Sequence, residues 1–143
     1  MKNSVLLVED EKKTADMLRQ ALESEDIDVT AVTDGRAALD VVAKGKFDLI
    51  ILDLKLPGIN GDEVLEEIRK IDPYVEVLVY TNYQEPPVMK KLINLGVEGY
   101  ISKGAEADLW DTVEKVKAML DPLSQQERDD VLASTPPGTF QTK

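Results

Sequence analysis

The feature that most constrains the fold is a regular alternation of short apolar runs with longer amphipathic segments. Five such units follow one another along most of the chain. The third run, Leu49 to Leu52, is continuous rather than alternating, as expected for a strand buried on both faces of a parallel sheet. Short strands separated by helical segments predict a doubly wound parallel sheet with helices on both faces. We therefore expect an α/β fold with this run in the middle of the sheet.

The boundaries of the expected elements follow from apolar periodicity and from the glycine, proline and aspartate residues at the breaks. The expected strands are 4–8, 27–32, 48–53, 75–81 and 97–102, and the expected helices are 12–24, 34–45, 62–70, 86–95 and 106–120. The last helix is the most regular, because Leu109, Val113, Val116 and Leu120 recur on one helical face.

A length of 143 residues suits a single domain, which we assign to residues 1–120. The pattern breaks down from Asp121, and the Pro, Gly and Thr stretch at 134–142 is typical of a disordered tail. Residues 121–143 are then either a short helix followed by disorder or the remnant of a truncated output region. Leu123-Ser124 and the residues after them faintly resemble the opening of a helix-turn-helix domain, but the segment is too short to be one, so we favour the helix.

Composition removes several classes of chemistry. The chain has no cysteine, which excludes disulfides, and no histidine, which excludes Ser-His-Asp mechanisms and ordinary zinc sites. Its formal net charge of −11 repels phosphate backbones, so we expect no direct binding to nucleic acid. Its apolar runs are far shorter than a membrane span, and its first residues do not resemble a signal peptide. We therefore expect a cytoplasmic protein that does not associate with membranes.

Polar side chains stand at the carboxyl ends of four expected strands. Glu9 and Asp10 end the first strand, Asp53 the third and Thr81 the fourth, and Lys103 follows the fifth. Each residue alone is more often an ordinary solvated or strand-end group, but four such clusters at one edge fit poorly with chance. Ligands bind at this edge in doubly wound sheets. Three carboxylates there would repel one another unless a hard cation neutralised them, and Mg²⁺ suits such a site.

Four stretches of the sequence, in this order and at this spacing, resemble the response-regulator receiver family. They are Val-Glu-Asp-Glu at 8–11, Leu-Asp-Leu-Lys-Leu-Pro-Gly at 52–58 followed by Gly61, Thr81, and Gly-Tyr-Ile-Ser-Lys at 99–103. The resemblance extends from Ser4 to Leu120. It implies a flavodoxin-like (βα)5 fold with strand order 2-1-3-4-5.

The resemblance also implies a role for each polar residue. Asp53 would accept a phosphoryl group, Thr81 would hydrogen-bond that group, and Lys103 would pair with its oxygens. The implied Mg²⁺ ligands are Glu9 through water, Asp10, Asp53 and the backbone carbonyl of Lys55. Phosphoryl transfer needs positioning and charge neutralisation rather than a strong base, so these groups suffice for the site to assist its own phosphorylation.

The partners follow from the same resemblance. A sensor histidine kinase or a phosphotransfer protein would supply the phosphoryl group. Thr81 would then move toward that group, and Tyr100 would turn inward beside buried Ile101 to fill the space. The surface formed by the helix at 86–95, the strand at 97–102 and the helix at 106–120 would change and dock a downstream protein or a second copy of the chain. The residues expected on that surface are Lys90, Lys91, Tyr100 and Trp110. Without the resemblance, a tyrosine with a fixed hydrogen bond is the simpler interpretation of Tyr100.

Two departures from the family pattern bear on the site. Gly104 follows Lys103 where many receivers have proline, which leaves the isomer of that peptide open, and Asn82 follows Thr81 where a smaller residue is common.

The competing hypothesis is a Mg²⁺-dependent phosphohydrolase with an aspartate nucleophile. Such enzymes usually carry an acid/base aspartate two residues after the nucleophile, where this chain has Lys55. We therefore favour a signalling domain that is not an enzyme in its own right.

Overall fold

The structure is a computed structural model that describes residues 2–81, 86–102 and 107–121. Strands and helices alternate through these ranges as the sequence predicts. The strands are β1 (Ser4–Val8), β2 (Asp28–Val32), β3 (Leu49–Leu52), β4 (Glu76–Thr81) and β5 (Gly99–Ser102). The helices are α1 (Lys12–Glu23), α2 (Gly35–Lys44), α3 (Gly61–Ile71), α4 (Pro86–Asn94) and α5 (Ala107–Leu120).

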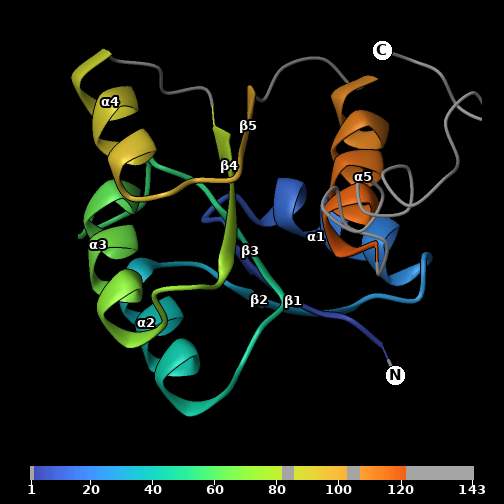
Figure 1. Cartoon of the computed structure of the whole chain (residues 1–143). Coiled ribbons are helices and arrows are strands. Elements are labelled where there is room, and N and C mark those ends of the chain that lie inside the picture. The colour runs from blue at the N-terminus through green and yellow to red at the C-terminus, as the bar shows by residue number, and fades with distance from the viewer. Residues whose placement is uncertain (1, 82–85, 103–106, 122–143) are drawn as a thin grey trace, which may run out of the picture.

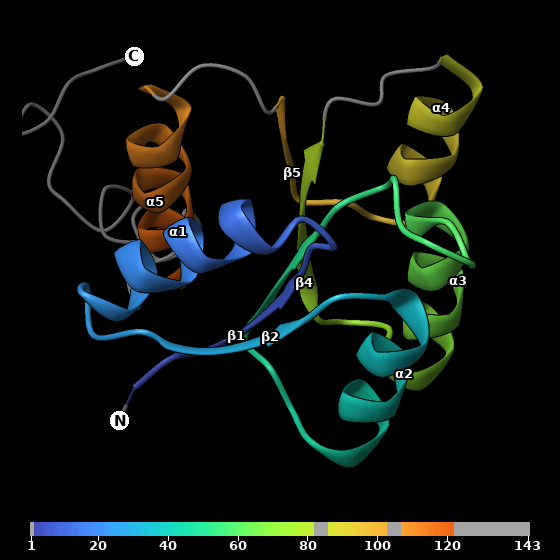
Figure 2. The same ribbon diagram turned by 180° about the vertical axis from the view of Figure 1, so that it is seen from behind.

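The five strands form one parallel sheet in the order β2-β1-β3-β4-β5 (Figure 1). Helices α2, α3 and α4 cover one face of the sheet, and α1 and α5 cover the other, as the view from behind also shows (Figure 2). This is the doubly wound, flavodoxin-like arrangement with the strand order predicted above.

The central strands supply both hydrophobic cores because successive side chains of a strand point to opposite faces. In β3, Ile50 and Leu52 join the core beneath α2, α3 and α4, whereas Leu49 and Ile51 join the core beneath α1 and α5. None of these four side chains is exposed to solvent. The continuous apolar run therefore marks a strand buried on both faces, in mid-sheet.

The helix ends are held by specific contacts. Asp34 caps α2 by accepting a hydrogen bond from the backbone N–H of Ala37 at 2.8 Å. At the other end of the sheet, the Arg69 guanidinium of α3 donates to the carbonyl oxygens of Val75, Leu95 and Gly96 at 2.6, 2.8 and 2.9 Å. Arg69 thereby ties the last turn of α3 to the chain that follows α4.

The predicted boundaries lie within two residues of those observed wherever the structure describes them. The largest difference is in β5, which begins at Gly99 rather than at 97, because Val97 donates its N–H to Leu92 of α4 instead of to a strand. The prediction that Ile101 is buried is wrong. Ile101 is only partly buried, because β5 is an edge strand with one neighbour.

The expected tail at 122–143 lies outside the described residues, as do Asn82, Lys103, Gly104 and residue 106, where the last helix was expected to begin. Among the helices that the structure does describe, none is long and apolar enough to span a bilayer.

Candidate functional site

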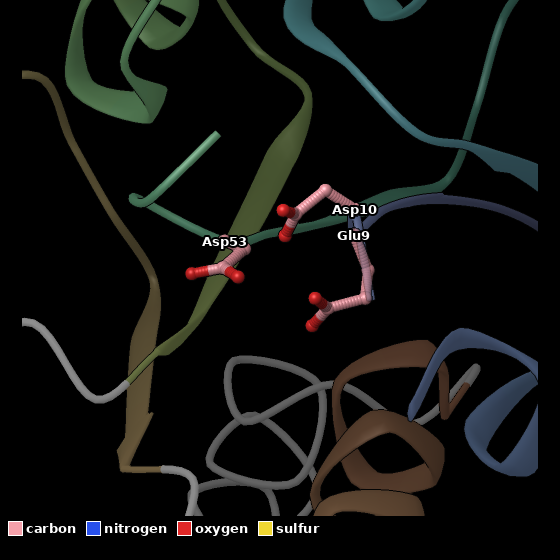
Figure 3. Close-up of side chains that lie close together, drawn as sticks. All are labelled: Glu9, Asp10 and Asp53. Carbon is pink, nitrogen blue, oxygen red and sulfur yellow. The ribbon is translucent and has the colours of Figure 1, made fainter. Parts of the chain in front are cut away.

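Three carboxylates meet beyond the carboxyl ends of β1 and β3. Glu9 and Asp10 follow β1, and Asp53 follows β3, its neighbour in the sheet. Their side chains turn toward a common space (Figure 3), and one carboxylate oxygen from each lies within 4.8 Å of the others. Glu9 and Asp53 are buried, with 1% and 4% of their surface exposed, whereas Asp10 is open to solvent. Two acidic groups are thus enclosed, and the third stands at the entrance.

Backbone hydrogen bonds extend the strand pairing by one residue and so aim these side chains. Asp53 donates its N–H to the carbonyl oxygen of Val8 at 3.0 Å, and Glu9 donates its N–H to that of Val32 at 3.1 Å. The carboxylates are also held locally. Glu9 Oε2 accepts from the N–H of Glu11 at 3.0 Å, and Asp53 Oδ1 accepts from the N–H of Lys55 at 3.2 Å. The ends of β1 and β3 therefore hold the carboxylates of Glu9 and Asp53 in place.

Thr81 stands at the same edge of the sheet, at the end of β4, and only 1% of its surface is exposed. Its strand pairs with β3 on one side and with β5 on the other, where Thr81 lies opposite Ser102. The structure therefore brings three of the four predicted clusters to one edge. The fourth, Lys103, lies outside the described residues.

The donor set fits a hard divalent cation. All three groups offer carboxylate oxygens, which are the ligands that Mg²⁺ and Ca²⁺ prefer, and Mg²⁺ characteristically takes few protein ligands and keeps several waters. Lys55, whose backbone carbonyl completes the predicted ligand set, follows Asp53 by two residues and has an exposed side chain.

Tyr100 lies in β5, opposite Val79 of β4, and packs partly against the core beneath α2, α3 and α4. Its ring is half-buried. Burial raises the pKa of the Tyr100 hydroxyl, and a side-chain hydrogen bond with Ser102 acts in the opposite direction. The phenol therefore already has a polar partner on its own strand, two residues away.

Lys91 of α4 pairs with acidic residues of the neighbouring helix. Its ammonium group forms ion pairs with Asp62 and Glu66 of α3, at 2.9 and 3.0 Å. These hydrogen bonds raise the pKa of Lys91. Lys91 therefore joins α4 to α3, and its place on the predicted docking surface stays a prediction. Lys90 and Trp110 are exposed, and 60% of the surface of Trp110 is open to solvent.

Comparison with known proteins assigns the fold and the acidic edge to a family. The family model of the response regulator receiver domain matches residues 5–114, a range that runs from within β1 into α5 and includes both acidic strand ends. The chain belongs to the response-regulator receiver family. It is a receiver domain of two-component signalling, and the phosphohydrolase alternative is not supported.

The relatives differ in length. The chain is 30% identical over 116 residues to sporulation initiation phosphotransferase F of Bacillus subtilis, covering 80% of this chain and 94% of that protein. It is 34% identical over 119 residues to the transcriptional regulatory protein YkoG of the same organism, covering 83% of this chain and 51% of YkoG. The chain thus spans about half the length of YkoG and nearly all of the phosphotransferase.

A solved receiver domain has the same fold. The CheY-like receiver protein of Methanospirillum hungatei superposes with a TM-score of 0.80 at 27% identity, over 91% of this chain and 99% of that one. The order of the strands is therefore that of a receiver domain.

Proposed function

We propose that Asp53 accepts the phosphoryl group of this receiver domain. The observation that supports this role is the enclosure of Asp53 and Glu9 within 4.8 Å of Asp10, at the end of the most deeply buried strand. A carboxylate at this position is aimed by its own strand and shielded from bulk water, as a nucleophile must be. In the transfer, an oxygen of Asp53 forms a bond to phosphorus while the bond from phosphorus to the donor breaks and the donor leaves with the electron pair.

The same proposal assigns the metal and the groups around the phosphoryl oxygens. Mg²⁺ would be held by Asp10, Asp53 and the backbone carbonyl of Lys55, with Glu9 acting through water. When bound, the ion neutralises the charge of the site and of the incoming phosphoryl group. Thr81 would donate a hydrogen bond to the phosphoryl group, and Lys103 would pair with its oxygens. Together these groups allow the domain to assist its own phosphorylation from a small donor.

The test is labelling with acetyl phosphate and Mg²⁺, followed by intact mass spectrometry. We expect one added phosphoryl group on the wild-type chain and none on Asp53→Asn. The matched control is Asp40→Asn, which removes an exposed carboxylate of α2 and should label like the wild type. Equal labelling of Asp53→Asn and the wild type would remove Asp53 from its proposed role.

Receiver domains interact with histidine kinases or phosphotransfer proteins, and we propose a sensor histidine kinase or a phosphotransfer protein as the physiological donor. We further propose that residues 1–120 form the receiver domain and that it acts in the cytoplasm. The absence of cysteine suits a reducing compartment, and the match to the family model lies within this range.

We propose that the output passes through Thr81 and Tyr100 to the surface made by α4, β5 and α5. Thr81 gains a hydrogen bond by moving toward a phosphoryl group, and the half-buried ring of Tyr100 can then move inward. The hydrogen bond between Tyr100 and Ser102 would oppose that movement. This surface, which bears Lys90, Lys91, Tyr100 and Trp110, would then dock a downstream protein or a second copy of the chain.

Amide NMR with beryllofluoride, which mimics the phosphoryl group, tests this output. We expect shifts that extend from Asp53 into α4, β5 and the start of α5, and a larger inward population of Tyr100 in Ser102→Ala. Shifts confined to the loops around Asp53 would refute the output surface while leaving Asp53 as the acceptor.

A further inference from the structure

We propose that Gly61, the first residue of α3, is a positioning residue for Asp53. Its lack of a side chain lets the beginning of α3 lie directly against the peptide that joins Asp53 to Leu54. The inference rests on the proposed role of Asp53 as phosphoacceptor and assigns to α3 a part in aiming that carboxylate.

The contact distances are too short for any residue other than glycine. A Cβ atom at Gly61 would lie 2.3 Å from the carbonyl oxygen of Asp53 and 2.6 Å from Cα of Leu54. Real Cβ atoms essentially never approach another heavy atom to less than 3.0 Å, and here both neighbours are backbone atoms. A side chain could therefore be accommodated only by moving α3 away from the end of β3, or by moving Asp53 itself.

Gly61 is needed because a side chain would not fit there, and not because of its backbone conformation. Within the described part of the chain, the glycines with positive φ are Gly58 and Gly96, so Gly61 has a backbone that an alanine could adopt. The close approach is also stabilised, because Gly61 donates its N–H to the carbonyl oxygen of Leu54 at 2.9 Å. Gly61 thus lies against the carbonyl oxygen of Asp53 and is hydrogen-bonded to the next residue, Leu54.

Asp53 is consequently held from three directions. Its N–H is bound to Val8 of β1 at 3.0 Å, its carboxylate accepts from the N–H of Lys55 at 3.2 Å, and its carbonyl group lies against Gly61. The Cβ atom of an alanine at position 61 would have to lie 0.7 Å farther from the carbonyl oxygen of Asp53 to reach the 3.0 Å limit. Because a misplacement of about 1 Å can slow a positioned reaction by roughly 100-fold, we expect a loss of roughly 10- to 100-fold in phosphorylation rate.

The chain offers two matched glycine controls. At Gly35, in the first turn of α2, a Cβ would meet Cγ2 of Val64 at 2.4 Å and Cγ2 of Ile59 at 2.6 Å. Gly35→Ala therefore disturbs the same helix and the loop before it, but through side-chain ends rather than through the Asp53 peptide. At Gly45 the nearest atom is 3.9 Å away, so Gly45→Ala introduces a methyl group without a clash.

The experiment measures the rate of labelling by acetyl phosphate with saturating Mg²⁺, across donor concentrations, beside urea unfolding of each variant. We expect Gly61→Ala to lower the maximal rate by roughly 10- to 100-fold with little change in the half-saturating donor concentration. Gly35→Ala should lose stability yet keep its rate within about threefold of the wild type under folding conditions, and Gly45→Ala should resemble the wild type in both measurements.

Two results would overturn the positioning role while the proposed function stands. One is a Gly61→Ala variant that labels at the wild-type rate, and the other is a Gly35→Ala variant that loses as much rate as Gly61→Ala. If the wild type takes no phosphoryl group, the proposed function fails, and the positioning role fails with it.

Hydrogen exchange of the wild type supplies a measurement that does not depend on a variant folding. If α3 holds the Asp53 peptide, the amide of Gly61 should exchange as slowly as the amide of Asp53, whose hydrogen bond continues the sheet. Exchange of the Gly61 amide at the rate of an open loop would also overturn the proposal.

Discussion

Replacing Asp53 with asparagine should stabilise the metal-free protein, although it should abolish phosphorylation. In the absence of Mg²⁺, the buried carboxylates of Asp53 and Glu9 repel each other, and Asp10 adds to this repulsion from the entrance of the site. Asparagine has nearly the same shape, and its carbonyl oxygen can still accept the hydrogen bond from the N–H of Lys55. The substitution therefore removes a charge with little loss of packing.

The magnitude follows from the separation of the oxygens. The carboxylate oxygens lie within 4.8 Å of one another, and two unit charges at that limit repel by about 3.5 kcal/mol at an effective dielectric constant of about 20. Counterions and the contacts that Asp53 makes in the native state offset part of this term, so we expect a net gain of about 2 kcal/mol. At about 3 °C per kcal/mol for a chain of this size, the midpoint of thermal unfolding should rise by roughly 6 °C.

The assay is thermal and urea unfolding in EDTA and again in saturating Mg²⁺. In EDTA, Asp53→Asn should be the more stable protein. In Mg²⁺ the wild type should gain stability by mass action and the variant should gain less, so the difference narrows or reverses. Asp40→Asn, which removes an exposed carboxylate of α2, should change stability by less than about 0.5 kcal/mol in either buffer. An Asp53→Asn variant that is less stable than the wild type in EDTA, or whose gain is unchanged by Mg²⁺, would refute the reasoning.

Three further predictions concern other parts of the molecule. Burial, with the nearby charge of Glu98, raises the pKa of Glu76 above its usual 4.5, so ionised Glu76 destabilises the folded protein once the pH rises through the folded pKa. Glu76→Gln should therefore raise the free energy of unfolding in urea at pH 7 and leave it unchanged below about pH 4. An equal effect at both pH values would contradict this reasoning. The ion pair of Lys91 and Asp62, whose side chains are 34% and 17% exposed, should show a coupling of about 0.5 to 1 kcal/mol in a double-mutant cycle of Lys91→Gln and Asp62→Asn. A coupling of zero would contradict the inference that this pair holds α4 to α3. The acidic chain should not shift duplex DNA in a gel at physiological salt, and micromolar binding would be the contrary result.

Much of the fold was predictable because the signals are local and repeated. The run from Leu49 to Leu52 predicted a strand buried on both faces, and the spacing of Val113 and Val116 predicted the inner face of α5; both residues are fully buried. The acidic edge was predictable for a topological reason. In a parallel sheet all carboxyl ends meet at one edge, so residues that follow different strands are brought together whatever their separation in sequence.

The direction of individual side chains was less predictable. The sequence placed Lys91 on α4, but it did not predict that two carboxylates of α3 would pair with its ammonium group. A helical pattern gives the position of a residue around its own helix, but the neighbouring helix decides which charges it meets. Ile101 was expected to be buried, but it is only partly buried, although the predicted strand order already placed its strand at the edge of the sheet. Burial at an edge depends on what covers it, which a strand's own sequence does not contain.

The sequence by itself determined the class of fold, the order of the elements and the carboxylates at the carboxyl ends of the strands, because these depend on periodicity and on chain order. Only the tertiary structure revealed that the beginning of α3 lies against the Asp53 peptide. In the sequence, Gly61 is one glycine in a loop rich in turn residues, and nothing local distinguishes a glycine needed for its backbone freedom from one needed for the space it leaves. That distinction depends on an approach between residues 53 and 61 that exists only after β3 and α3 have packed together.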